Sequence, residues 1–195
     1  MASGQIFSLA PLPPGTLAAP LDILVGTSSP AESWAIATFA DAAAAYMDFE
    51  GTLRGYGGSG VSLDIPSAAL VNTNNMVWQA AFRFIPDDTE DIDTTVHTYD
   101  YNTVTAAAPS VVGEVTYDTI TFTDGADMDS GANGQMFKLR ILRDPAHASD
   151  NLASRRHYFE RYDCIVGSRT TKRPEQAEAA VLHLWKQNEN GAPIA

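Results

Sequence analysis

The chain has 195 residues, enough for one domain with a buried core. Hydrophobic residues make up 45% and charged residues 18%, which is typical of a folded globular protein and too apolar for general disorder. The formal net charge of −12 would repel a phosphate backbone, so direct binding to DNA or RNA is not expected.

The sequence carries no feature that predicts a membrane or secretory segment. No window of about 18 uninterrupted apolar residues occurs, so no membrane-crossing helix is predicted. The opening stretch MASGQIFSLAPLPPG lacks the basic region and the long apolar core of a secretory signal. The single cysteine, Cys164, has no partner for an internal disulfide or a cysteine metal cluster, so we expect assembly in a reducing cytoplasm.

Residues 1–30 are predicted to form an extended, proline-rich N-terminal arm. They hold five of the eleven prolines, and their apolar residues do not recur with the spacing of a strand or of a helix, which favours extended backbone. Such a segment is either a disordered leader or an arm that orders against a partner. The second interpretation is favoured by its many apolar side chains, which are Ile6, Phe7, Leu9, Leu12, Leu17, Leu21, Ile23 and Leu24.

Residues 31–170 are predicted to form one antiparallel all-β domain. Short apolar alternations recur there, separated by Gly, Pro, Asn and Asp. Eight strands are expected, which is the count of a jelly-roll sandwich. They are Ser33–Phe39, Ala45–Leu53, Ser59–Ile65, Asn75–Ile85, Val96–Thr105, Gly113–Thr123, Gln135–Arg143 and His157–Gly167.

The clearest alternation lies in residues 77–85. Trp78, Phe82 and Phe84 fall on one face, while Gln79 and Arg83 fall on the other. The aromatic face is therefore predicted to be buried in the core, and the polar face to be exposed to solvent. The same reasoning places Cys164 in the core as a small hydrophobic residue.

Two stretches have features typical of a helix. The segment FADAAAAYM, residues 39–47, could be helical because of its alanines, although a strand break is expected there. Residues 171–195 are predicted to form a short helix and a tail, because Pro174 stands at a first helical position and Lys186 near the end. Its apolar stripe, Val181, Leu184 and Trp185, is more typical of a docking face than of a cofactor site.

The most acidic loops read as turns rather than as metal sites. The loop DGADMDSGANG, with Asp124, Asp127 and Asp129, lacks the spacing and the distal glutamate of an EF-hand. Short carboxylates commonly bond nearby backbone N–H groups in turns, which is the better interpretation. The run PDDTEDIDTT, residues 86–95, is expected to be a solvated loop, with a weak cation site as the alternative.

No catalytic, cofactor-binding or metal-ligating residue is predicted, and the protein is expected not to be an enzyme. The four histidines, His97, His147, His157 and His183, lack zinc-type spacing. The segment GYGGSG, residues 55–60, is neither a P-loop nor a nucleophile elbow and reads as a flexible hairpin turn.

Two segments resemble a family of small virion proteins of tailed bacteriophages. The stretch ITFTDGADMDSGANGQMFKLRILRDPAHASDNLA is similar to the closing half of those proteins, in which an ITFT-type strand precedes a DGA-x-MDS turn and an FRLRVRRD-type strand. The stretch YMDFEGTLRGYGGSGVSLDI resembles a strand, a Gly-rich turn and a second strand of the same family. Gln135 stands where the family more often has glutamate, and the two ends of the chain match poorly.

The resemblance implies a phage virion structural protein with a jelly-roll fold. Its expected role is that of a homotrimeric capsid decoration (cement) protein, which binds the major capsid protein on the outer surface of the head after assembly in the host cytoplasm. It implies no cofactor, no direct nucleic-acid binding and no membrane. The alternatives are a tail, neck or fibre component, and a carbohydrate-binding jelly-roll module. A sugar site would need an exposed aromatic platform beside acids, so the exposure of Trp34, Trp78 and Trp185 separates these hypotheses, and Trp78 is predicted to be core.

Overall fold

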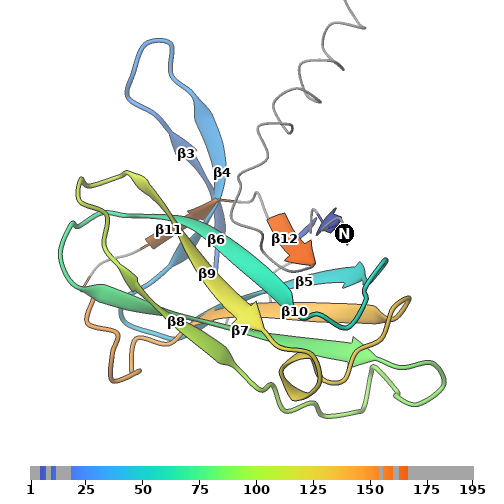
Figure 1. Cartoon of the computed structure of the whole chain (residues 1–195). Coiled ribbons are helices and arrows are strands. Elements are labelled where there is room, and N and C mark those ends of the chain that lie inside the picture. Colours follow the sequence, from blue (N-terminus) through green and yellow to red (C-terminus); the bar gives the residue numbers. More distant parts are fainter. Residues whose placement is uncertain (1–4, 8–9, 12–18, 154–155, 160–162, 167–195) are drawn as a thin grey trace, which may run out of the picture.

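The computed structural model describes residues 5–7, 10–11, 19–153, 156–159 and 163–166. These residues form two antiparallel sheets that pack face to face (Figure 1). The predicted all-β class and antiparallel jelly-roll sandwich are confirmed, with more strands than the eight expected. Among the described residues no helix is both long and apolar enough to cross a membrane.

The first sheet has seven of the described strands. They are β1 (Gln5–Phe7), β3 (Leu21–Val25), β4 (Ser33–Phe39), β6 (Val61–Ala69), β9 (Val115–Phe122), β11 (Arg156–Phe159) and β12 (Asp163–Val166). Strand β6 is its centre: it pairs with β9 along one edge, and with β12 and then β11 along the other. Beyond these, β12 pairs with β1, and β11 pairs with β4, which pairs with β3.

The second sheet has five of the described strands, in the order β2-β5-β10-β7-β8. They are β2 (Ala10–Pro11), β5 (Ala45–Thr52), β7 (Asn75–Ile85), β8 (Asn102–Ala107) and β10 (Met136–Arg143). Strand β10 lies in the middle, and Phe137, Leu139 and Ile141 on its inner face are buried against the first sheet.

The predicted last strand, His157–Gly167, is two strands. Strands β11 and β12 pair with successive parts of β6, and the change falls beside Pro66, which has no backbone N–H to donate to a neighbour. The register pairs Cys164 with Leu63, whose side chain is fully buried. The side chain of Cys164 itself lies outside the described residues.

Within residues 1–30, the described segments 5–7, 10–11 and 21–25 are extended, as predicted for the arm, but they are strands of the two sheets. Strand β1 pairs with β12, β2 with β5, and β3 with β4. The alanine-rich stretch 40–44 is not helical, and β5 begins at Ala45. The predicted C-terminal helix after residue 171 lies outside the described residues.

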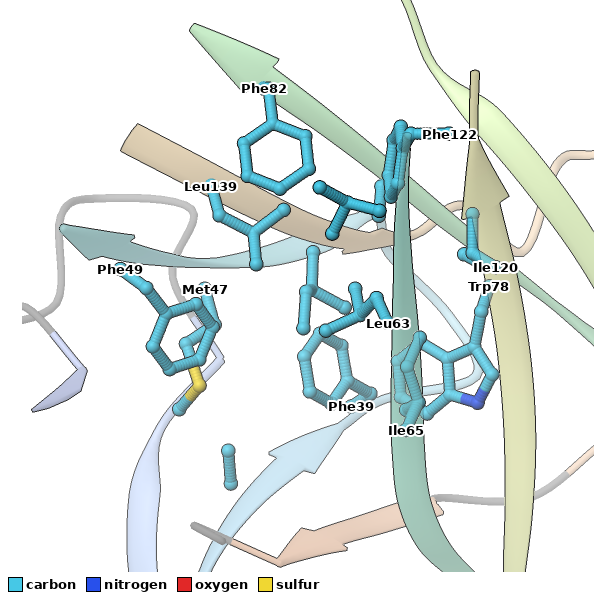
Figure 2. Close-up of a cluster of buried hydrophobic side chains, with 14 of the residues drawn as sticks. Phe39, Met47, Phe49, Leu63, Ile65, Trp78, Phe82, Ile120, Phe122 and Leu139 are labelled. Atoms are coloured by element: carbon cyan, nitrogen blue, oxygen red, sulfur yellow. The ribbon is translucent and has the colours of Figure 1, made fainter. Parts of the chain in front are cut away.

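The core between the sheets is rich in phenylalanine (Figure 2). Phe82 is 3% exposed and its ring contacts those of Phe84, Phe122 and Phe137, with centroids 4.8 to 5.6 Å apart. Trp78 is fully buried and meets Phe39 edge to face at 4.9 Å, so its prediction as a core residue is confirmed. Edge-to-face pairs add stabilisation beyond the area that they bury.

We expect Phe82→Ala to lower the free energy of unfolding by about 3 to 5 kcal/mol, because the ring would leave a cavity among three others. Urea denaturation measures the loss. The control is Ile92→Ala, since that side chain is 65% exposed and should cost little. A loss below about 1 kcal/mol at Phe82 would contradict the packing described.

A buried arginine joins strands that are distant in sequence. The Arg143 side chain is fully buried and pairs with Asp150 through Nε and Nη2, both at 3.0 Å. It also donates to the carbonyl oxygens of Ala40 at 3.1 Å and Leu152 at 2.7 Å. Asp150 in turn accepts the backbone N–H of Val77 at 3.2 Å. One charged pair therefore fixes β10, β7, the end of β4 and the loop after β10.

We expect Arg143→Met to lower the free energy of unfolding by about 3 to 5 kcal/mol, because Asp150 would remain buried without its counter-charge. Thermal and urea denaturation measure the change. Lys138→Met is the matched control, since it removes a cation from the outer face of the same strand and should change stability by about 0.5 kcal/mol or less. Equal losses in the two variants would contradict the role given to Arg143.

Candidate functional site

The acidic loop after β9 is a corner between the two sheets. It joins β9 to β10 and contains a short 3-10 helix, η1 (Ala126–Met128). Asp127 accepts hydrogen bonds from the backbone N–H of Thr123 at 2.9 Å and from its hydroxyl at 2.6 Å. Asp129 adopts a left-handed conformation and accepts the N–H of Phe84 at 3.2 Å. The turn interpretation is confirmed for Asp127, whereas Asp129 bonds a strand 45 positions away in the sequence.

The third acid, Asp124, holds the glycine-rich segment 55–60. The Tyr56 hydroxyl donates to Asp124 at 2.6 Å and accepts the N–H of Gly60 at 3.2 Å. The prediction of a hairpin turn for this segment was wrong, because it connects β5 to β6, which lie in different sheets. Gly60 is required there: its φ is +81°, and a Cβ would collide with the carbonyl oxygen of Phe122.

Burial and hydrogen bonds shift two pKa values at this corner. Burial, and then the hydrogen bond to Asp124, raise the pKa of Tyr56 to about 12. The hydrogen bonds from Thr123 lower the pKa of Asp127. Both shifts favour the protonation states present at neutral pH, so the corner is stable there. Among the described residues no group of three or more His, Cys, Asp or Glu side chains is placed to hold a metal ion.

We expect Tyr56→Phe to lower the free energy of unfolding by about 1 kcal/mol at neutral pH, because Asp124 and Gly60 lose a partner. The folded-state pKa of Tyr56 lies above the ordinary tyrosine value of 10.0, so this contribution is present below that pH and is lost as the pH rises through about 12. Denaturation at several pH values should therefore show the two proteins converging above about pH 10. A difference that is constant with pH would contradict the assignment.

A long connection between β7 and β8 covers residues 86–101, along the lower edge of the molecule in Figure 1. Its acidic part is mostly exposed, as predicted for residues 86–95, and turns on itself through Asp91, which accepts the N–H of Asp93 at 3.0 Å. Glu90, in the same acidic segment, contacts the sheet: its carboxylate oxygen lies 2.7 Å from Nη2 of Arg83 on β7. Structureless connections of this length are uncommon in compact domains and often carry function.

The strand predicted at Val96–Thr105 begins only at Asn102. The alternation of His97, Tyr99 and Tyr101 suggests a strand, but these rings contact one another along the connection instead. His97 meets Tyr99 at 5.0 Å and Tyr99 meets Tyr101 at 5.9 Å between ring centroids. The run therefore brings aromatic rings onto the outer face of the five-stranded sheet, where Tyr99 contacts Arg140.

Arg140 is the centre of this surface. It lies directly opposite Asp48 on the neighbouring strand β5, and its Nε and Nη2 each donate to one Asp48 oxygen at 2.7 Å. Its guanidinium carbon lies 4.0 Å from the ring centroid of Tyr46 and 4.4 Å from that of Tyr99. We call Tyr46, Asp48, Tyr99, Tyr101 and Arg140 the tyrosine–arginine face.

The tyrosine–arginine face is half-buried and electrically balanced. Side-chain exposure is 22% for Arg140 and 18% for Asp48. Burial raises the pKa of Tyr99 and of Tyr101, so both hydroxyls keep their protons well above neutral pH. Burial alone would lower the pKa of Arg140, but the hydrogen bonds and charge of Asp48 outweigh it and the net shift is upward. The face therefore presents fixed donors, an ion pair and aromatic rings together.

Sequence reasoning did not identify this face. The sequence does place Arg140 and Asp48 at outward-facing positions of two predicted strands, but it does not show that those two strands are neighbours.

The exposure of the tryptophans was expected to separate the hypotheses. Trp34 is 51% exposed on β4, away from the tyrosine–arginine face, and Trp185 lies outside the described residues. His147 accepts the N–H of Ser149 in a turn, and the side chains of His157 and His183 are outside the described residues.

No family model matches the chain, and no curated protein sequence matches it. Among solved structures, a similar one is a family 29 carbohydrate binding module from Piromyces equi, with 10% identity, a TM-score of 0.41, and 90% of this chain and 97% of the module covered. Another is TmCBM61 in complex with beta-1,4-galactotriose, with 7% identity, a TM-score of 0.35, and 76% and 87% covered.

The predicted function as a phage capsid decoration protein is contradicted by this comparison, in which the similar structures are carbohydrate-binding modules. The motifs behind that prediction describe two corners of a β-sandwich, which is a fold shared by proteins of many functions. The homotrimer and the virion location implied by the same resemblance stay predictions. What binds this chain has to be judged from its own side chains.

Proposed function

We propose that the protein is a non-catalytic carbohydrate-binding module and that its ligand lies on the tyrosine–arginine face. The observation that carries the proposal is the arrangement around Arg140: two tyrosine rings stack on a guanidinium that Asp48 holds with two hydrogen bonds. Aromatic surface and oriented polar groups thus share one half-exposed patch of a rigid sheet.

Sugars need both kinds of group. Their ring faces expose C–H bonds, which pack on aromatic surface, while their rims carry hydroxyls that donate and accept hydrogen bonds. Asp48 offers acceptor oxygens, and the protonated hydroxyls of Tyr99 and Tyr101 are able to donate. Because Arg140 and Asp48 face each other across two paired strands, their geometry is set before a ligand arrives, which lowers the entropic cost of binding.

The charges favour a neutral sugar. The chain carries a formal net charge of −12, which repels polyanionic glycans over long range. At the surface itself, Arg140 is neutralised by Asp48 and Arg83 by Glu90, so neither cation is left to attract an anionic ligand. Hydrogen bonds and ring contacts then supply most of the binding free energy, which suits neutral polysaccharides.

The proposal predicts that Tyr99→Ala weakens binding to a neutral soluble polysaccharide by about 10- to 100-fold, as expected for a central aromatic contact. Affinity electrophoresis in gels containing glucans, mannans or galactans identifies the ligand, and calorimetry then gives the dissociation constants.

Tyr117→Ala is the matched control, because Tyr117 is 72% exposed on β9 of the other sheet. It should leave binding unchanged. The melting temperature of each variant is measured alongside, so that a loss of folding is not counted as a loss of binding. Failure of the wild-type protein to be retarded by any neutral polysaccharide, or equal losses in both tyrosine variants, would overturn the proposal.

A further inference from the structure

The hairpin of β3 and β4 projects beyond the sandwich and carries an uncovered apolar surface (Figure 1). On β3, Leu21, Ile23 and Val25 alternate onto one face and are 42%, 66% and 57% exposed. They continue the face that turns into the core farther along β4, where Ala37 and Phe39 are fully buried. Exposed aliphatic residues in this number on one strand indicate an interaction surface.

Within the described part of the chain, the same strand leaves one backbone edge unpaired. Among the described strands β3 pairs only with β4. The N–H of Thr38 donates to the oxygen of Pro20 and the N–H of Gly26 to that of Glu32, which places positions 20, 22, 24 and 26 in hydrogen-bonded pairs with β4. In an antiparallel ladder the intervening residues point their N–H and C=O groups the other way. Leu21, Ile23 and Val25 therefore direct theirs toward the free edge.

We propose that β3 pairs with β3 of a second copy of this chain, antiparallel and centred on Ile23. In that register Ile23 lies opposite Ile23 of the other copy, and Leu21 lies opposite Val25. These are the residues whose N–H and C=O groups face outward, so the backbone pairing needs no change in the β3–β4 ladder. A two-fold contact of this kind closes on itself.

The distribution of charge explains why a second copy fits. Two acidic chains repel each other over most of their surfaces, but residues 21–37 carry two charged side chains only, Asp22 and Glu32. The symmetric register sets Asp22 opposite Leu24 rather than opposite Asp22, so no acids meet across the ladder. In the single chain the Asp22 carboxylate accepts the outward N–H of Ile23 at 2.8 Å, a local bond that the pairing would replace.

Sedimentation equilibrium of the full-length protein over a range of concentrations tests the proposal. We expect the mass to rise from one chain to two. Ile23→Lys, which places two cations face to face at the axis, should raise the dissociation constant at least about tenfold. Val112→Lys is the control, since Val112 is 51% exposed in the loop before β9, and it should leave the dimer unchanged.

A pair of substitutions at one position tests the register. Leu24→Asp would put two carboxylates opposite each other and should abolish the dimer, whereas Leu24→Lys would face Asp22 and should keep it. Both lose the same contact with Trp34, the partner of Leu24 on β4, so their melting temperatures should agree. A single-chain mass at every concentration, a three-chain mass, or equal effects of the two Leu24 variants would overturn the proposal.

Discussion

The buried pair of Arg143 and Asp150 is the contact on which the arrangement of the sandwich depends. Taking two charges out of water is costly, and the cost is offset here because the guanidinium and the carboxylate satisfy each other and several backbone groups as well. The bonded groups come from both sheets and from the loop after β10. The pair therefore fixes how the two sheets meet at this end, where apolar packing alone would permit sliding.

The opposite end of the sandwich is fixed by its two corners. Each carries the chain from one sheet to the other, and the Tyr56 hydroxyl of one corner donates a hydrogen bond to Asp124 of the other. With both ends held, the five-stranded sheet is a rigid support for the tyrosine–arginine face. The acids of the β9–β10 loop thus have a structural role. The residues proposed to bind a ligand lie on β5, on β10 and in the connection of residues 86–101.

The strand pattern was readable from the sequence wherever apolar residues that face the core recur at every second position. Asn75–Ile85 was predicted with its observed bounds because its aromatic residues alternate with polar ones. The prediction failed at residues 96–101, where the tyrosines alternate for a different reason: Tyr99 packs on Arg140 of β10, and Tyr101 contacts Tyr99. The tyrosine–arginine face depends on β5 and β10 being neighbours, and such a pairing between residues 92 positions apart leaves no local signal.

The tip of the β3–β4 hairpin can change in sequence without disturbing the core, because of where β4 lies in the first sheet. Because β12 and β11 pair with successive parts of β6, the first sheet divides into two branches. One branch continues from β11 to β4 and β3, and the other from β12 to β1. The tip of the β3–β4 hairpin, residues 26–32, is largely exposed and contributes no side chain to the core cluster. Its length and composition are thus free of the packing constraints that govern the sandwich. Related chains could gain, lose or exchange this tip while keeping the same core, and a peptide grafted there would be displayed on a stable scaffold.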